Sequence, residues 1–284
     1  KIEDELAEKH AKIQEYEGIL ADRAKVLDIV KTEALNLRDK YSDDRRTEIS
    51  AVSGEVDIED LIPVEDCVLT KTVNGYIKRL PADTYNVQNR GGRGITGMTT
   101  REEDAVENMF VCSSHDYIML FSNLGRMYRI KAYEIPEGSR TSKGMNIVNL
   151  LPLENGEKIS AMLSVPADDE GKYLCMFTKK GLIKRTALSL YKNIRKNGLN
   201  AISLREDDEL VFVKITSGED ELLIATKKGM CIHINETNAR PLGRTATGVK
   251  VITLKDGDEV AGVAVLHEGG KVLTVSETGY GRRS

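Results

Sequence analysis

The feature of this sequence that most limits its fold is a short phrase that recurs about every fifty residues. Each copy has a Ser or Thr, two further residues, a glycine, and an apolar stretch that usually ends in basic residues. The copies are residues 72–79, 122–129, 178–185, 226–233 and 276–283. A second glycine follows about twenty residues after the first in four copies, at Gly94, Gly144, Gly198 and Gly248. Two glycines that recur with similar spacing in successive copies indicate stacked or radially arranged units.

The residues inside each repeat alternate between apolar and polar and are rich in branched and aromatic side chains, which predicts half-buried strands. Examples are residues 109–112, 117–121, 173–177, 210–215 and 222–225. The Ser/Thr-x-x-Gly element predicts a tight hairpin turn between two of these strands. About four strands fit in one repeat, and several such sheets can bury both faces when they pack radially. We therefore expect a mainly β, propeller-like β-pinwheel of four-stranded antiparallel blades.

Residues 1 to about 41 have a different pattern, with apolar residues at helical spacing. They predict two helices with a break near residues 18–22. The apolar stripes could pack on each other or on a coiled-coil partner, and the sequence does not separate these alternatives. The predicted organisation is a helical segment at residues 1–50, a linker at 51–57 and the pinwheel at 58–284.

The composition places the chain among ordinary globular proteins. Its 284 residues are 40% hydrophobic, and no stretch reaches the roughly 18 apolar residues that cross a bilayer. The charged start at Lys1 lacks the pattern of a signal peptide, so we expect a cytoplasmic protein with no membrane partner. Cys67, Cys112, Cys175 and Cys231 all lie in apolar strand segments, so we expect them to be reduced core residues. The four histidines are scattered, so we expect no metal site.

The net charge of −4 is unevenly distributed along the chain. Residues 1 to 60 hold 10 Lys and Arg against 17 Asp and Glu, and the rest of the chain holds 31 against 28. Basic residues recur at two equivalent places in the repeats. The first tier, in the recurring phrase, is Lys78, Arg79, Arg126, Arg129, Lys184, Arg185, Arg282 and Arg283. The second tier, near the second glycine, is Arg90, Arg93, Arg140, Lys143, Arg195, Lys196, Arg240 and Arg244.

If equivalent positions of each blade lie on one rim, these charges form a continuous basic track. A duplex could bind such a track through its phosphates, and the contacts would offset an elastic bending cost of order 1 to 6 kcal/mol. Repeated charges can equally keep a repeat protein soluble, and the spacing alone does not decide between the two.

The heptad Gln88-Asn89-Arg90-Gly91-Gly92-Arg93-Gly94 lies at the second glycine of the first repeat. Arginine forks fit phosphate oxygens, and glycines let backbone N–H groups approach a ligand. The heptad resembles the gyrase-A box, the signature of the C-terminal domain of the DNA gyrase A protein. Residues 75–79, 114–117, 133–137 and 149–153 also resemble that family in order and spacing, and residues 40–49 resemble the end of its breakage-and-reunion module.

The resemblance implies a six-bladed β-pinwheel that wraps DNA and supports ATP-dependent negative supercoiling by the holoenzyme. The box residues that match the motif, and so carry the wrapping role by resemblance, are Gln88, Arg90, Gly91, Gly92, Arg93 and Gly94. The implied partners are double-stranded DNA, the gyrase B protein and a second gyrase A protein in an A2B2 heterotetramer. The implied chain has no catalytic residues and no cofactor of its own, because ATP and Mg²⁺ are used elsewhere in the holoenzyme. The implied location is the bacterial nucleoid.

Two departures from the family pattern limit the expectation. Asn89 replaces a usual basic residue, so we expect a salt slope lower by about one and weaker wrapping. The sequence ends within the fifth repeat, so we expect about four and a half repeats and an incomplete pinwheel.

One alternative is the C-terminal domain of the A-type protein of topoisomerase IV, whose box is degraded. Another is a propeller-type protein-interaction scaffold, although the chain has no Trp and lacks those repeat signatures. Nucleotide binding is disfavoured because neither residues 91–94 nor residues 142–144 have the P-loop spacing.

Overall fold

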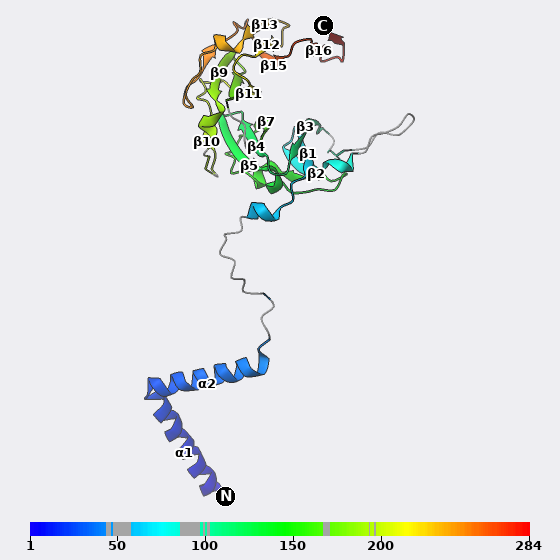
Figure 1. Cartoon of the computed structure of the whole chain (residues 1–284). Helices are drawn as coiled ribbons and strands as arrows, with labels where there is room; N and C mark the ends of the chain where they lie inside the picture. The colour runs from blue at the N-terminus through cyan, green and yellow to red at the C-terminus, as the bar shows by residue number, and fades with distance from the viewer. Residues whose placement is uncertain are drawn as a thin grey trace. The chain divides into compact units, whose positions relative to one another are not determined.

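The structure, a computed structural model, describes residues 1–43, 47, 58–85, 97, 98, 100, 103–166, 171–192, 194, 195 and 197–284. The chain divides into two compact units, residues 1–55 and 56–284, each drawn in Figure 1. The predicted linker at residues 51–57 and the predicted box at residues 88–94 lie outside the described residues.

The first unit is made of two helices, α1 (Ile2–Leu20) and α2 (Arg23–Tyr41). The break falls where the sequence predicted it, because the Asp22 side chain caps α2 by accepting a hydrogen bond of 2.9 Å from the Ala24 N–H. Neither helix has a buried residue, and Ile2 and Leu20 are 83% and 79% exposed. Within the described residues, the apolar stripes of both helices therefore remain exposed.

Within its described residues, the second unit contains five antiparallel sheets. The first is β1 (Asp66–Thr72), β2 (Tyr76–Pro81), β3 (Val106–Ser113) and β6 (Met145–Asn146). The second is β4 (Tyr117–Ser122), β5 (Arg126–Lys131), β7 (Ile159–Val165) and β10 (Leu199–Asn200). The third is β8 (Tyr173–Thr178), β9 (Leu182–Ala187), β11 (Leu210–Thr216) and β14 (Val249–Lys250). The fourth is β12 (Glu221–Thr226), β13 (Cys231–Asn235) and β15 (Val260–Leu266), and the fifth is β16 (Leu273–Val275) and β17 (Gly281–Arg283).

Short 3₁₀ helices precede the first strand and connect later ones. They are η1 (Ile58–Leu61), η2 (Ala82–Thr84), η3 (Ala132–Glu134), η4 (Ile147–Asn149), η5 (Leu188–Tyr191) and η6 (Glu236–Asn238). Four of them, η2, η3, η5 and η6, directly follow the second strand of a hairpin, at the same place in successive repeats. The mainly β fold with propeller-like blades is thus confirmed.

The hairpin turns repeat in detail. Each first glycine has a left-handed backbone, with φ between 80° and 86° at Gly75, Gly125, Gly181, Gly229 and Gly279. In every copy the Ser or Thr side chain at the start of the turn accepts the N–H of the residue four positions on, at 3.0 to 3.2 Å. The Ser/Thr-x-x-Gly prediction is confirmed, because glycine adopts positive φ without strain and the hydroxyl satisfies a turn donor.

The second glycines precede short strands that connect neighbouring repeats. The two-residue strands that follow Gly144, Gly198 and Gly248 are β6, β10 and β14, and each completes the sheet of the preceding repeat. The sequence predicted about four strands within each repeat. The second, third and fourth repeats do contain four strands each, but the four do not share one sheet. In each of the first three sheets, three strands come from one repeat and the fourth from the next, which ties neighbouring repeats together.

The core lies between successive sheets. One cluster joins the first and second sheets around Leu69 and Leu120, a second joins the second and third around Phe121 and Leu174, and a third joins the third and fourth around Phe177 and Ile224. Each middle sheet therefore buries both faces, which a single four-stranded sheet could not do.

Three of the four cysteines are buried, as predicted, but Cys231 is exposed. Cys231 lies on β13, an edge strand of the fourth sheet that pairs only with β12 among the described strands. In the preceding sheets the equivalent strand is covered by the fourth strand from the next repeat. The prediction that Cys231 is a core residue was wrong because, among the described strands, no fourth strand covers β13. Within the described residues, no helix is long and apolar enough to cross a membrane.

Candidate nucleic-acid interface

The two basic tiers of the second unit differ sharply in burial. The first-tier side chains of Lys78 and Lys184 are fully buried, and those of Arg79 and Arg185 are nearly so. Most of the second tier is exposed. The six matching residues of the box, Asn89 and Lys196 lie outside the described residues, so the structure places neither the box nor Lys196.

Lys78 lies in the middle of β2 and points into the protein. Its Nζ donates to the carbonyl oxygens of Ser139, Arg140 and Ser142 at 3.1, 2.7 and 3.0 Å. Burial lowers the pKa of Lys78 below its ordinary value, because removing an ammonium from water disfavours its charged form. The expectation that Lys78 is a rim charge is therefore corrected.

Lys184 occupies the equivalent position of β9. Its Nζ donates to the carbonyl oxygens of Ala201, at 2.5 Å, and Arg244. Burial, with a smaller contribution from the Arg244 charge, lowers the pKa of Lys184 to about 8. Lys184 is likewise not a rim charge, since its donors are used inside the protein.

Arg79 follows Lys78 and binds carboxylates and a backbone carbonyl of the second unit. Its guanidinium forms ion pairs with Glu65 and Glu137, at 3.0 and 3.6 Å, and its Nε donates to the Ile135 carbonyl. The side chain is 12% exposed. These contacts join β2 to the segment after η3, in the next repeat, so Arg79 links two repeats.

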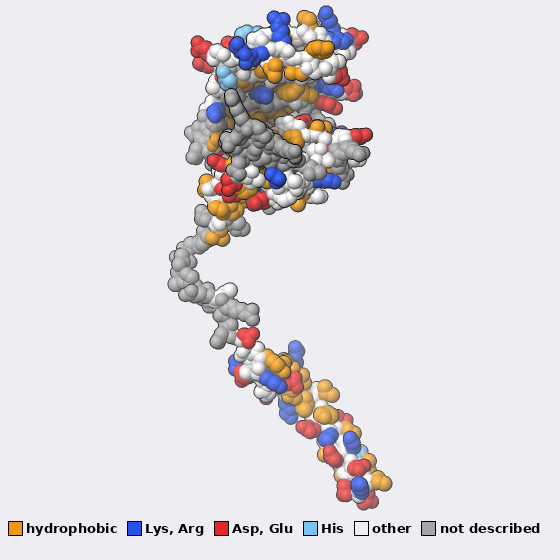
Figure 2. Space-filling view, turned by 90° about the vertical axis from the view of Figure 1, so that its right-hand side faces the viewer, with side chains coloured by type: hydrophobic (Ala, Val, Ile, Leu, Met, Phe, Trp, Pro, Cys, Tyr) orange, Lys and Arg blue, Asp and Glu red, His pale blue; other side chains and the backbone are white. Residues whose placement is uncertain are grey.

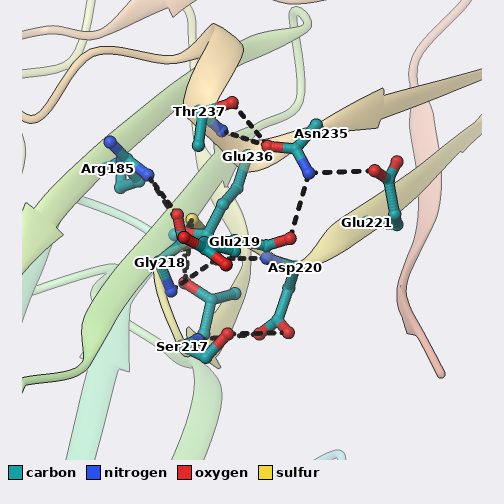
Figure 3. A network of polar contacts seen from close by, with 11 residues as sticks. Arg185, Ser217, Gly218, Glu219, Asp220, Glu221, Asn235, Glu236 and Thr237 are labelled. Carbon is teal, nitrogen blue, oxygen red and sulfur yellow. Dashed lines mark hydrogen bonds and ion pairs between the residues drawn. The ribbon is translucent and has the colours of Figure 1, made fainter.

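Arg185 has the same role between the third and fourth sheets (Figure 3). It donates to the Gly218 carbonyl at 3.0 Å and lies 3.5 Å from the carboxylate of Glu236, which is fully buried. That carboxylate also accepts from the Thr216 hydroxyl at 2.7 Å and from the N–H groups of Gly218 and Asp220, each at 2.8 Å. A buried carboxylate needs such donors, so Glu236 organises this junction.

Arg126 and Arg129 lie on β5 and are half-buried. Arg126 forms an ion pair with Glu154 and donates to the Asn197 carbonyl at 2.8 Å. The guanidinium of Arg129 stacks 4.2 Å from the ring centre of Tyr117 and lines a cavity of about 460 Å³. Arg126 thus holds the segment that carries Asn197, whereas Arg129 reaches the cavity.

The second tier presents its side chains outward. Its exposed members are Arg140, Lys143, Arg195, Arg240 and Arg244. Among the described residues, none of these five forms an ion pair. At the end of the chain, Arg282 and Arg283 on β17 are also exposed. In Figure 2, Lys and Arg side chains stand beside Asp and Glu side chains on the visible described surface, so the basic positions there form no uniform basic face.

The second-tier segments lie close against the first-tier strands. At Gly144 (φ 74°) an added Cβ would collide with the Ile77 carbonyl and lie 3.0 Å from the Lys78 Cβ. At Gly248 (φ 101°) it would lie 2.6 Å from the Ile183 carbonyl and 3.3 Å from the Lys184 Cβ. Only glycine allows this approach, which places each exposed second-tier segment directly over the preceding sheet.

Sequence reasoning missed the acidic and aromatic groups that hold the junctions. Tyr128 occupies the position of Lys78 and Lys184 in the second repeat, and its hydroxyl donates to the Glu157 carboxylate at 3.0 and 3.1 Å. Burial, with the Glu157 contact, raises the pKa of Tyr128 to about 12. The signal was the position of Tyr128 in the recurring phrase, which aligns an aromatic with two lysines. Among the described residues, no group of His, Cys, Asp and Glu side chains could hold a metal ion.

Comparison with known proteins identifies the family. The profile described as the DNA gyrase C-terminal domain, beta-propeller, matches residues 68–113, 116–166, 172–217 and 220–267. Each matched range covers most or all of the three long strands of one of the first four sheets. The chain belongs to the family of DNA gyrase C-terminal domains.

Individual relatives agree with this assignment. The DNA gyrase A protein of Staphylococcus aureus (strain NCTC 8325) is 50% identical over all of this chain, which covers 32% of that protein. A solved DNA gyrase A C-terminal domain is 30% identical with a TM-score of 0.63, over 77% of this chain and 71% of that one. A solved C-terminal domain of DNA topoisomerase IV is 26% identical with a TM-score of 0.64, over 78% and 68%. The chain spans about a third of the length of the gyrase A proteins that it matches.

Proposed function

We propose that this chain binds double-stranded DNA along its second-tier segments and bends the duplex around the successive blades. The observation that carries this proposal is the exposure of basic side chains at equivalent places in three consecutive repeats, at Arg140 and Lys143, Arg195, and Arg240 and Arg244. The box predicted for the first repeat occupies the equivalent place in the sequence. A duplex that follows these places would curve, because the segments belong to successive sheets.

The chemistry of the second tier suits phosphates. Arginine offers a planar fork of donors that matches phosphate oxygens, and lysine adds a mobile positive charge. Each neutralised phosphate releases condensed counterions, which gives affinity without reading base sequence. Curvature costs elastic energy of order 1 to 6 kcal/mol for a few tens of base pairs, which contacts on several blades can offset.

The wider role rests on the names of the relatives. We propose that the chain works within an ATP-dependent type II topoisomerase, where its partners are the gyrase B protein and a second gyrase A protein in an A2B2 assembly. In that assembly the wrapped DNA would support negative supercoiling, while ATP and Mg²⁺ act in other parts of the enzyme. The proposed location is the bacterial cytoplasm, on the nucleoid.

The direct test of binding is a titration of linear duplex DNA across a salt series. Replacing Arg140 and Lys143 with Ala should lower the salt slope of the binding constant by about two. The matched control replaces Lys227 and Lys228, which are also exposed but bind Glu259 and the Asp256 carbonyl in a turn. An equal loss of slope in both variants would show that only overall charge matters, and no binding at low salt would refute the proposal.

The test of wrapping reads topology instead of affinity. Circular DNA is nicked, bound and religated, and a linking-number change that grows with protein concentration is expected. Replacing Arg90 and Arg93 with Ala should reduce this change more than it reduces affinity, since the second tier of other blades still holds the duplex. An equal loss of both would count against a special role of the box, and binding without any linking-number change would refute wrapping.

A further inference from the structure

The buried lysines of the first tier contact the loops that carry the exposed second-tier charges. Lys78, in the first sheet, donates to three carbonyl oxygens of residues 139–142. Lys184, in the third sheet, donates to the carbonyl oxygens of Ala201 and Arg244. In both cases the ammonium belongs to one repeat and Arg140 or Arg244 to the next.

These contacts compensate a charge that would otherwise be costly to bury. Among the described residues, neither Lys78 nor Lys184 forms an ion pair, so backbone carbonyls are the groups that replace water around each ammonium. A buried ammonium without hydrogen-bond acceptors would cost several kcal/mol. The hydrogen bonds to the ammonium therefore stabilise the loop conformation in which these carbonyls point inward. In that conformation the side chains of the loop point outward.

The second repeat shows a different solution at the same position. Tyr128 replaces the lysine there, and its hydroxyl binds Glu157, with a long contact to the Pro152 carbonyl. The segment above it, which carries Arg195, is held instead by Arg126 through the Asn197 carbonyl. The lysines are thus specific to the loops of Arg140, Lys143 and Arg244.

We propose that Lys78 and Lys184 are positioning residues for phosphate binding, each holding the basic loop of the following repeat in the conformation that presents its side chains to DNA. Lys78 acts on the loop of Arg140 and Lys143, and Lys184 acts on the loop of Arg244. This inference rests on the proposed DNA binding and extends it to residues that cannot reach DNA. It explains why lysines in a recurring basic phrase are kept inside the protein.

The test is a pair of crossed double-mutant cycles on the whole chain, read as affinity for linear duplex DNA. Lys78→Met should weaken binding by roughly fivefold or more. The same substitution should have no further effect when Arg140 and Lys143 are already Ala, and should keep its full effect when Arg244 is Ala. Lys184→Met should have no further effect when Arg244 is already Ala, and should keep its full effect when Arg140 and Lys143 are Ala. Additive effects in every background would overturn the proposal, because they would mean direct DNA contact or a general loss of structure.

The control variant is Lys71→Met. Lys71 is also buried in the first sheet, but it pairs with Glu107 and not with a basic loop. It should lower stability and leave DNA affinity unchanged, and an equal loss of affinity would overturn the positioning role. If Lys78→Met does not fold, Lys78→Gln replaces it in the same cycle. Its amide has two donors on a side chain one bond shorter, so it cannot satisfy all three carbonyls, and a smaller loss of affinity with the same dependence on the background is expected.

A second readout separates this inference from the proposed function. Amide hydrogen exchange of residues 139–143 should accelerate at least roughly tenfold in Lys78→Met, while exchange of the β8–β9 hairpin stays unchanged. If the Arg140 and Lys143 variant binds DNA normally, the proposed interface fails, and faster exchange would leave Lys78 with a loop-holding role alone. Unchanged exchange in the loop would overturn the positioning role, whatever the DNA result.

Discussion

The two basic tiers have the same composition and similar spacing, yet the lysines of the first tier and the described residues of the second lie in opposite environments. Lys78 and Lys184 are buried and bind carbonyls, whereas Arg140 and Arg244 are exposed and, among the described residues, form no ion pair. The difference arises because the second tier of one repeat covers the first tier of the preceding one. A recurring positive charge is therefore a structural connector in one tier and a candidate ligand contact in the other.

Two first-tier arginines are connectors as well. Arg79 and Arg185 bind carboxylates and carbonyls of the next repeat, so they hold neighbouring blades together. Arginine suits this role because it stays charged and uses several donors at once. The tiers can be distinguished experimentally, since a connector should affect stability and a ligand contact should affect DNA binding.

The largest expected effect is on the connector between the third and fourth sheets. Replacing Glu236 with Ala should lower the free energy of unfolding by about 3 to 5 kcal/mol, because it leaves Arg185 and two backbone N–H groups without their buried acceptor. Urea denaturation measures this loss. The control is Glu221→Ala, whose carboxylate is half-exposed beside His233, and a loss as large there would contradict the connector role of Glu236.

The next effect concerns the close approach of the two tiers. Gly144→Ala and Gly156→Ala both place an alanine at positive φ, which costs about 1 to 2 kcal/mol. Only Gly144 faces the Ile77 carbonyl and the Lys78 side chain, while an added Cβ at Gly156 has nothing within 4 Å. Gly144→Ala should therefore cost about 1 to 3 kcal/mol more in thermal or urea unfolding. Equal costs would mean that the second tier does not pack closely on the first.

A smaller effect is the pH dependence that Lys184 gives to stability. Its folded pKa of about 8 lies below the ordinary value of 10.5, so the unfolded chain binds more protons between these values. Its contribution to the free energy of unfolding should therefore rise from about pH 8 to about pH 10. Urea unfolding of the parent chain and Lys184→Met across this range should diverge accordingly. Parallel pH profiles would show that the ammonium of Lys184 is not buried.

The smallest effect on stability belongs to the second tier. Arg195→Ala and Arg240→Ala should each change the free energy of unfolding by no more than about 0.5 kcal/mol, because both side chains are exposed. The same variants should each lower the salt slope of DNA binding by about one. A stability loss comparable to that of Glu236→Ala would place these residues in the connector class and break the distinction between the tiers.

Much of the fold could be predicted because its signals are local. A turn that needs positive φ selects glycine, and a strand that is half-buried selects alternation, so the hairpins could be read from short stretches such as residues 72–79. The exposure of Cys231 could not be predicted, since its strand looks like the buried ones. It depends on whether a fourth strand from the next repeat covers the edge, which no local pattern records.

The candidate site likewise combines features that the sequence determined with one that only the tertiary structure decided. The sequence alone determined the period of the repeats, the turn glycines, and two recurring sets of basic residues, because each depends on neighbours within a few positions. Only the tertiary structure decided which of these basic side chains face water. Lys78 meets the Arg140 carbonyl 62 residues further along the chain, and that contact exists because Gly144 lets the next repeat pack on β2. Burial is a property of packing between repeats, so the role of a charge was settled there.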